Sequence, residues 1–154
     1  MRAARDYRSN PFVPGLAGRI EALVEETPPD AVGLSLNYLS QALGAFALIG
    51  FIRDRFPRIA VVLGGGLVTS WLGRTGGRNP FAGLVDHCVA GPGEGFLLGL
   101  AGVSADGEPF ARPDYSGFPA GGYLSPGPVL PYSASSGCHW RRCIFCPERA
   151  EGQC

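Results

Sequence analysis

The sequence predicts an α/β protein whose centre is a partial Rossmann-like (flavodoxin-like) parallel sheet with flanking helices. Three short apolar runs, at residues 31–36, 59–63 and 85–90, have the length and composition of buried strands. Helical patterns lie between or after these runs, and an alternation of strands with helices is typical of a parallel sheet. Glycine-rich stretches follow the second and third runs, as expected where strands end in tight turns.

The elements follow one another in a regular order. Residues 15–27 carry apolar side chains at helical spacing, and two prolines end this helix before the strand at 31–36. The next helix, over residues 40–56, is apolar on almost every side, so it needs cover from more than one direction. After the second strand at 59–63 and the third strand, residues 96–103 form a last helix.

The composition excludes several classes of function. The 13 basic and 13 acidic side chains cancel, so we expect no nucleic-acid partner. The longest apolar run, residues 42–52, is shorter than the roughly 20 residues that a membrane helix needs, so we expect no membrane partner. The first residues carry positive charge without an apolar segment behind them, which favours a cytoplasmic location.

The chain divides into three parts. Residues 1–104 form the α/β unit, and residues 105–132 are rich in glycine and proline, as expected of a linker or crossing segment. Residues 133–154 hold four of the five cysteines. We therefore expect two chemically distinct regions joined by an extended segment.

Three loops are expected to lie at one edge of the sheet, because parallel strands gather their ligand contacts at their carboxyl ends. They are Asn37-Tyr38, residues 64–66 and residues 91–95. Two of them are glycine-rich, which lets the backbone approach a ligand closely. The alternative interpretation is that these glycines only make tight turns between strands and helices.

The cysteine spacing predicts a metal centre near the end of the chain. Cys138, Cys143 and Cys146 place three thiolates on one short loop. An iron–sulfur cube held by three cysteines keeps one iron free for a small molecule, whereas a structural zinc site needs a fourth ligand, which Cys154 or His139 could supply. Disulfides are the least expected use, because the cysteines are close together and the compartment is expected to be reducing.

The loop CHWRRCIFC resembles the cluster motif of the radical S-adenosylmethionine superfamily, CxxxCxxC with an aromatic residue before the last cysteine. Phe145 fills the aromatic position, and the first gap is one residue longer here. The preceding segment, residues 113–138, resembles the approach segment of radical enzymes that carry an N-terminal cobalamin-binding domain. By this resemblance residues 133–154 are the start of the radical S-adenosylmethionine barrel.

Residues 1–104 are in turn similar to part of a cobalamin-binding domain. In that family a serine loop after one strand and a Gly-Gly loop after the next lie around the nucleotide tail of the cofactor, and a Gly-Glu-Gly turn follows the third strand. Asn37 stands where the family's serine loop has leucine. The residues that the resemblance implies as cofactor contacts are Ser35, Gly64, Gly65, Gly93 and Glu94.

The family's DxHxxG loop, which supplies a histidine to cobalamin, has no counterpart here. The histidines are His87 and His139, and the sequence around His87 does not fit the spacing. Three explanations stay open: the first strand and its loop lie before Met1, cobalamin binds without a protein histidine, or the domain no longer binds it.

The resemblance implies that Cys138, Cys143 and Cys146 hold a 4Fe-4S cluster that binds S-adenosylmethionine at its open iron, with Phe145 beside it. Reductive cleavage would give a 5'-deoxyadenosyl radical, with cobalamin as methyl carrier or radical partner in a methylation or rearrangement. The implied partners are these small-molecule cofactors and an electron donor such as flavodoxin or ferredoxin. Because only eight residues follow Cys146, we expect the chain to be a fragment that is inactive on its own.

Two other interpretations stay open. The cysteines could form a non-catalytic zinc module, with Cys154 as fourth ligand, on a Rossmann-like ligand-binding domain. Alternatively, the α/β unit binds a ligand and the cysteine segment takes no part. Metal content distinguishes the first from an iron–sulfur protein, and ligand affinity without the cysteines distinguishes the second.

Overall fold

A three-stranded parallel sheet forms the centre of residues 1–104, which confirms the predicted α/β class and is compatible with a Rossmann-like fold. The strands are β1 (Ala31–Ser35), β2 (Ala60–Gly64) and β3 (His87–Cys88), in the order β1-β2-β3. The computed structural model describes residues 1–104, 114–117, 127, 129, 138–140 and 142–143.

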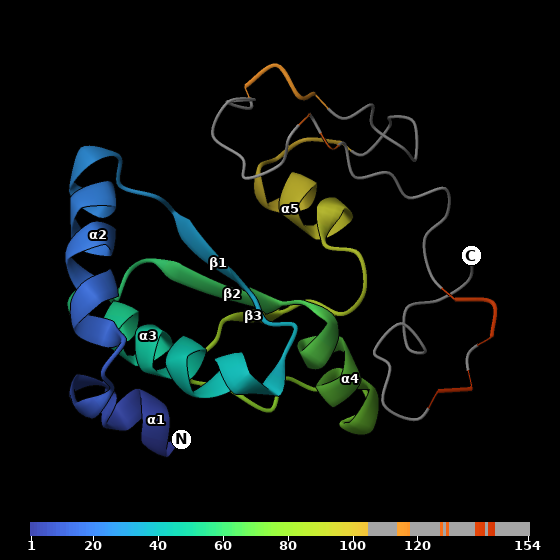
Figure 1. Ribbon diagram of the computed structural model, residues 1–154, viewed down its shortest axis with the longest axis horizontal. Helices are drawn as coiled ribbons and strands as arrows, with labels where there is room; N and C mark the ends of the chain where they lie inside the picture. Colours follow the sequence, from blue (N-terminus) through green and yellow to red (C-terminus); the bar gives the residue numbers. More distant parts are fainter. Residues whose placement is uncertain (105–113, 118–126, 128, 130–137, 141, 144–154) are drawn as a thin grey trace.

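Helices lie on both faces of the sheet (Figure 1). They are α1 (Arg2–Arg5), α2 (Val13–Glu26), α3 (Ala42–Arg55), α4 (Gly66–Arg74) and α5 (Glu94–Leu100), with single 3-10 turns η1 (Tyr7–Ser9) and η2 (Leu39–Gln41). The helices predicted at 15–27, 40–56 and 96–103 correspond to α2, to η2 with α3, and to α5. In the described part of the chain, no helix has the length and apolar composition of a membrane span.

Two elements differ from the sequence-based prediction. Helix α4 was not predicted, because the three glycines at 64–66 look like a loop, yet the last of them already begins this helix. Its buried apolar side chains, Val68 and Leu72, join the core. The third strand is shorter than the predicted 85–90, although the N–H groups of Asp86 and Val89 still donate to β2 carbonyls at its two ends.

The two faces of the sheet carry very different side chains. Because neighbours in the register share a face and successive residues alternate, the strands divide into two sets. The set that packs in the core with α3 is Val32, Leu34, Val61 and Leu63. The set on the opposite face is Ala31, Gly33, Ser35, Ala60, Val62 and Gly64. The second set is made mostly of small residues, and α5 lies over it (Figure 1).

Helix α3 is covered from several sides, as its apolar sequence predicts. Ile49 and Ile52 are fully buried. Gly50 lets α1 come close, because a Cβ there would overlap the backbone carbonyl of Ala4. Phe46 meets the ring of Phe81 with centroids 4.9 Å apart. The sheet, α1 and the segment before β3 therefore all pack on one helix.

A charged group ties α3 to the amino ends of β2 and β3. Arg53 donates to the carbonyls of Leu84 at 2.7 Å and Ile59 at 3.3 Å, and it pairs with Asp86 at 2.5 Å. The same carboxylate oxygen accepts the Val61 N–H at 2.7 Å. Burial disfavours the charged form of Asp86, but the hydrogen bonds from Val61 and Arg53 outweigh it and lower the pKa of this carboxyl.

We expect Asp86→Asn to lower the free energy of unfolding at pH 7 by about 1 kcal/mol, because the lost bonds involve a charged group but are screened by solvent. The side chain of Asp86 is 41% exposed, which justifies the low figure. A carboxyl whose pKa is lowered on folding stabilises the fold above its unfolded pKa, and this stabilisation is lost as the pH falls through the folded value.

The stability difference between Asp86→Asn and wild type should therefore be constant near neutrality and shrink below about pH 4. Urea unfolding at a series of pH values measures it. The exposed Asp30 provides the control variant Asp30→Asn. A difference that stays the same on acidification would show that the charge of Asp86 contributes nothing.

Candidate functional site

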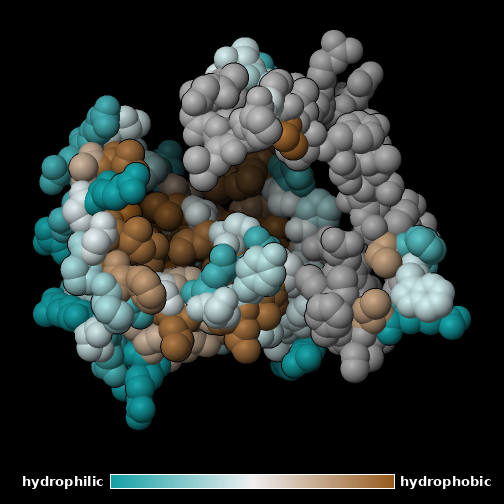
Figure 2. All heavy atoms as spheres, viewed as in Figure 1, coloured by the Kyte–Doolittle hydropathy of each residue, from teal (hydrophilic) through white to brown (hydrophobic). Residues whose placement is uncertain are grey.

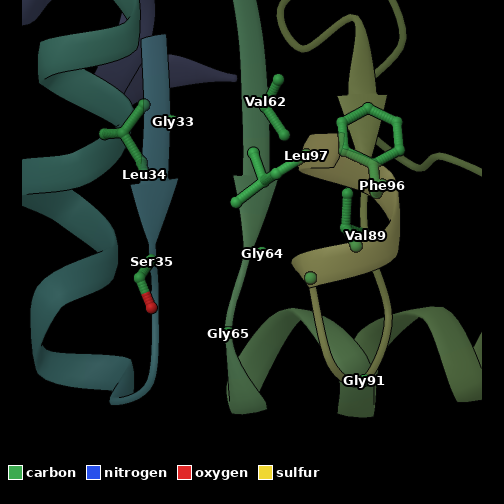
Figure 3. A pocket seen from close by; sticks show the side chains of 11 residues that line it. Gly33, Leu34, Ser35, Val62, Gly64, Gly65, Val89, Gly91, Phe96 and Leu97 are labelled. Carbon is green, nitrogen blue, oxygen red and sulfur yellow. The ribbon is translucent and has the colours of Figure 1, made fainter. Parts of the chain in front are cut away.

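A pocket of about 380 Å³ lies between the small-residue face of the sheet and α5, toward the carboxyl ends of the strands. Its sheet side is formed by Gly33, Ser35, Val62 and Gly64. Its other side is formed by Gly91, Gly93, Phe96 and Leu97. Figure 3 shows these residues from β1 and β2 next to those of α5. Figure 2 shows apolar surface in the hollow over the sheet, between α2 and α5.

The chemistry of the wall is simple. Among the residues that line the pocket, Ser35 is the one with a polar side chain, and none carries a charge. An uncharged group can enter without losing charge hydration, whereas an ion would find no opposite charge to pair with. The pocket therefore suits a neutral, largely apolar part of a ligand.

Four of the predicted contact residues meet at this pocket: Ser35, Gly64, Gly65 and Gly93 all line it. The fifth, Glu94, does not. It is the exposed first residue of α5, where a carboxylate interacts favourably with the helix dipole. The position of Glu94 is thus explained by its interaction with the start of α5, whereas the other four residues share the pocket.

The loop after β1, which was predicted to lie at this edge of the sheet, is tied to the start of α4 by Asn37. Its Oδ1 accepts the N–H of Gly66 at 2.9 Å, and its Nδ2 donates to the Ser35 hydroxyl at 3.4 Å. Gln41 holds the same loop, because its Oε1 accepts the N–H groups of Asn37 and Tyr38. A short polar side chain after a strand is a weak signal, so this role could not be read from the sequence.

These hydrogen bonds limit the ability of the loop at residues 64–66 to bind an anion. A free helix N-terminus is a common site for anions because its first N–H groups lack partners. At α4 the N–H of Gly66 donates to Asn37, and that of Leu67 donates to the Leu36 carbonyl at 3.1 Å. Two of the groups that would hold a phosphate are therefore already used by the protein.

The loop after β3 is anchored to α4. The N–H of Gly91 donates to the Thr69 hydroxyl at 2.9 Å, and Thr69 is buried. Gly91 has a φ of +67°, a conformation that glycine adopts readily. The three loops predicted to share one edge of the sheet are thus joined there by specific hydrogen bonds.

Gly65 has a structural role that the sequence left open. Its φ is +101°, and a Cβ would lie 2.6 Å from the Leu36 carbonyl oxygen and 2.7 Å from the Leu36 nitrogen. The tight-turn interpretation therefore accounts for Gly65. Gly64 differs, because a Cβ there would meet the nearest atom, the Val89 oxygen, at an ordinary 3.7 Å.

The cysteine region is described only in part. Cys138 is half-buried and Cys143 exposed, and both are free thiols. Between them the Arg142 guanidinium lies 5.4 Å from the centre of the Trp140 ring. The predicted positions Phe145 and Cys146, like Cys154, lie outside the described residues. Where side chains are described, no group of three or more metal ligands is found.

Cys88, which lies outside this loop, is an inert thiol. Its Sγ donates to Asn79 Oδ1 at 3.1 Å on the core side of β3. Burial raises the pKa of the thiol, so it stays protonated at neutral pH. We assign it a packing role.

We expect Gly65→Ala to lower the free energy of unfolding by about 2 kcal/mol or more, because a positive φ alone costs an L-residue roughly 1–2 kcal/mol and the added Cβ collides with Leu36. The neighbouring Gly64→Ala should stay within about 1 kcal/mol of wild type. Urea unfolding of both variants measures this. Equal losses would contradict the close approach of the two loops.

Comparison of the chain with protein-family models, with curated proteins and with solved structures found no match.

Proposed function

We propose that this chain is the N-terminal part of a radical S-adenosylmethionine enzyme, in which the pocket binds the nucleotide tail of cobalamin and the cysteine loop binds a 4Fe-4S cluster. The observation that carries the proposal is that Ser35 and Gly64, the last residues of β1 and β2, line one pocket together with Gly93, which precedes α5. The cluster motif follows the same domain in the chain. A protein with only one of these features would fit the family less well.

The pocket suits the base at the end of the cobalamin tail in polarity. The tail ends in a dimethylbenzimidazole, an uncharged planar ring. A Cβ added at Gly33, Gly91 or Gly93 would meet nothing within 4 Å, so the space beside these residues is open. The neutral wall favours a ring of this kind, and Ser35 offers one hydrogen-bonding group at the end of β1.

The cysteine loop suits an iron–sulfur cluster in the chemistry of its donors. Thiolates are the usual ligands of such clusters, and Cys138 and Cys143 are accessible free thiols. When bound, the cluster would supply the electron that cleaves S-adenosylmethionine. The protein's share is to ligate through Cys138, Cys143 and Cys146, to orient the bound molecules and to exclude water, with Phe145 beside the cluster.

We expect the full chain, reconstituted without air with iron and sulfide, to hold about four irons and four sulfides per molecule. Metal and sulfide analysis with the absorption spectrum measures this. Simultaneous change of Cys138, Cys143 and Cys146 to alanine should abolish it. Cys88→Ala, which removes a thiol outside the loop, is the matched control and should keep the cluster.

One tightly bound zinc without iron would overturn the cluster assignment and favour the zinc module. A cluster that survives the triple variant would show that its ligands lie elsewhere. The zinc result would leave the pocket as the remaining functional site.

We expect the chain to bind hydroxocobalamin at one site, measured by equilibrium dialysis. Gly93→Leu should weaken this binding by about tenfold or more, a change of about 1.4 kcal/mol, because the new side chain enters space that the tail would use. Gly73→Leu is the control, since Gly73 also has open space but lies on α4 outside the pocket. Cobinamide, which lacks the nucleotide, should respond to neither change.

Equal effects of Gly93→Leu on cobalamin and cobinamide would place the tail outside the pocket. Absence of hydroxocobalamin binding would exclude cobalamin as the ligand of this domain.

A further inference from the structure

Helix α5 is the least buried element that touches the pocket. None of its seven residues is buried, and Leu97 and Leu100 are 54% and 47% exposed. A helix this short is not stable by itself, since isolated helices below roughly 12–15 residues are marginal in water. It therefore depends on contacts with the rest of the protein.

Those contacts are few in the described part of the chain. The Phe96 ring lies 5.2 Å from the His87 ring of β3, measured between centres. The backbone hydrogen bonds that α5 shows there stay within the helix and the residues beside it, from Gly93 to Val103. No backbone hydrogen bond shown in that part joins α5 to the sheet that it covers.

On the β1 side, the sheet beneath α5 leaves open space. Phe96 and Leu97 face the pocket from one side, and Gly33, Val62 and Gly64 form the other (Figure 3). A Cβ built on Gly33 would meet no atom within 4 Å. Gly33 is exposed, whereas Val62 is buried, so the open space lies beside Gly33. Protein interiors are normally close-packed, so α5 lacks packing contacts at that position.

Both ends of α5 are built to allow movement. Before it, Gly91 has a φ of +67° and is fixed to Thr69 by its N–H. After it, Gly102 has a φ of +69°. A helix between two such glycines can swing about its anchored end without breaking a hydrogen bond to the sheet.

We propose that α5 is a lid held closed by the occupant of the pocket, an uncharged planar group that fills the space between Gly33 and Val62 on one side and Phe96 and Leu97 on the other. The group supplies the contacts that the sheet lacks beside Gly33, so α5 packs more firmly when the pocket is filled. The identity of the natural occupant as the cobalamin tail rests on the proposed function. The lid itself rests on the packing described above.

A ring in this position would bind the closed state and not the open one. The measured affinity of the ring is then lower when a larger fraction of the molecules is open. A protein side chain that fills the space between the sheet and α5 should raise the closed fraction. A side chain grown from Gly33 can do this, because it enters the same space. The lid can therefore be tested without any ligand.

The test is hydrogen–deuterium exchange of the full chain, with peptides that cover α5 compared with peptides that cover α4. Gly33→Leu should slow exchange in α5 by about tenfold without ligand and leave α4 unchanged. Gly33→Val, which suits a strand, repeats the test with a smaller side chain. Gly73→Leu is the matched control and should change neither α5 nor the pocket.

In wild type, hydroxocobalamin should slow exchange in α5, whereas cobinamide should not. Slow α5 exchange in Gly33→Leu without any hydroxocobalamin binding to wild type would keep the lid and reject the proposed cofactor. Two results would overturn the lid: α5 exchange in unliganded wild type as slow as that of α4, or unchanged α5 exchange in both Gly33 variants while α4 stays protected.

Discussion

The close approach of the loops after β1 and β2 is the constraint on which the site depends. Gly65 can lie against the Leu36 backbone only because it has no side chain. This approach lets the Leu36 N–H donate to the Gly64 carbonyl at 2.8 Å and the Leu67 N–H donate to the Leu36 carbonyl. Ser35 is thereby held beside Gly64, and α4 begins at once. The pocket, the cap on α4 and the polar loop around Asn37 all follow from one missing Cβ.

The sequence predicted those elements that can be recognised from the spacing of apolar residues and from the positions of glycines. The three strands, their parallel arrangement and helices α2, α3 and α5 follow from such patterns, and so does the gathering of the loops after the strands at one edge. The place of Ser35 among the contacts came from the family resemblance. Helix α4 was not predicted because glycines, which are typical of loops, stand at its start, although its interior is amphipathic. The role of Asn37 depends on a partner 29 residues away in the chain, which no local pattern reveals.

Small residues on one face of the sheet have two effects, one on the pocket and one on the packing of α5. They open a pocket under α5, and they deprive α5 of the packing that would hold it. On the other face, Val61 and Leu63 are fully buried in the core, so the packing of that face does not involve α5. The protein can thus keep a rigid base and a weakly held cover in one small unit.

The placement of charge completes this separation. The ion pairs in the described part of the chain join Arg8 to Asp54, Arg53 to Asp86 and Arg55 to Glu21, and each involves a residue of α3. They stabilise the side of the molecule away from the pocket, whose edge carries the neutral polar side chains of Ser35, Asn37 and Gln41. A ligand at this edge would therefore be recognised by its shape and by single hydrogen bonds. Any charged part of a ligand must stay at the open mouth, where water still solvates it.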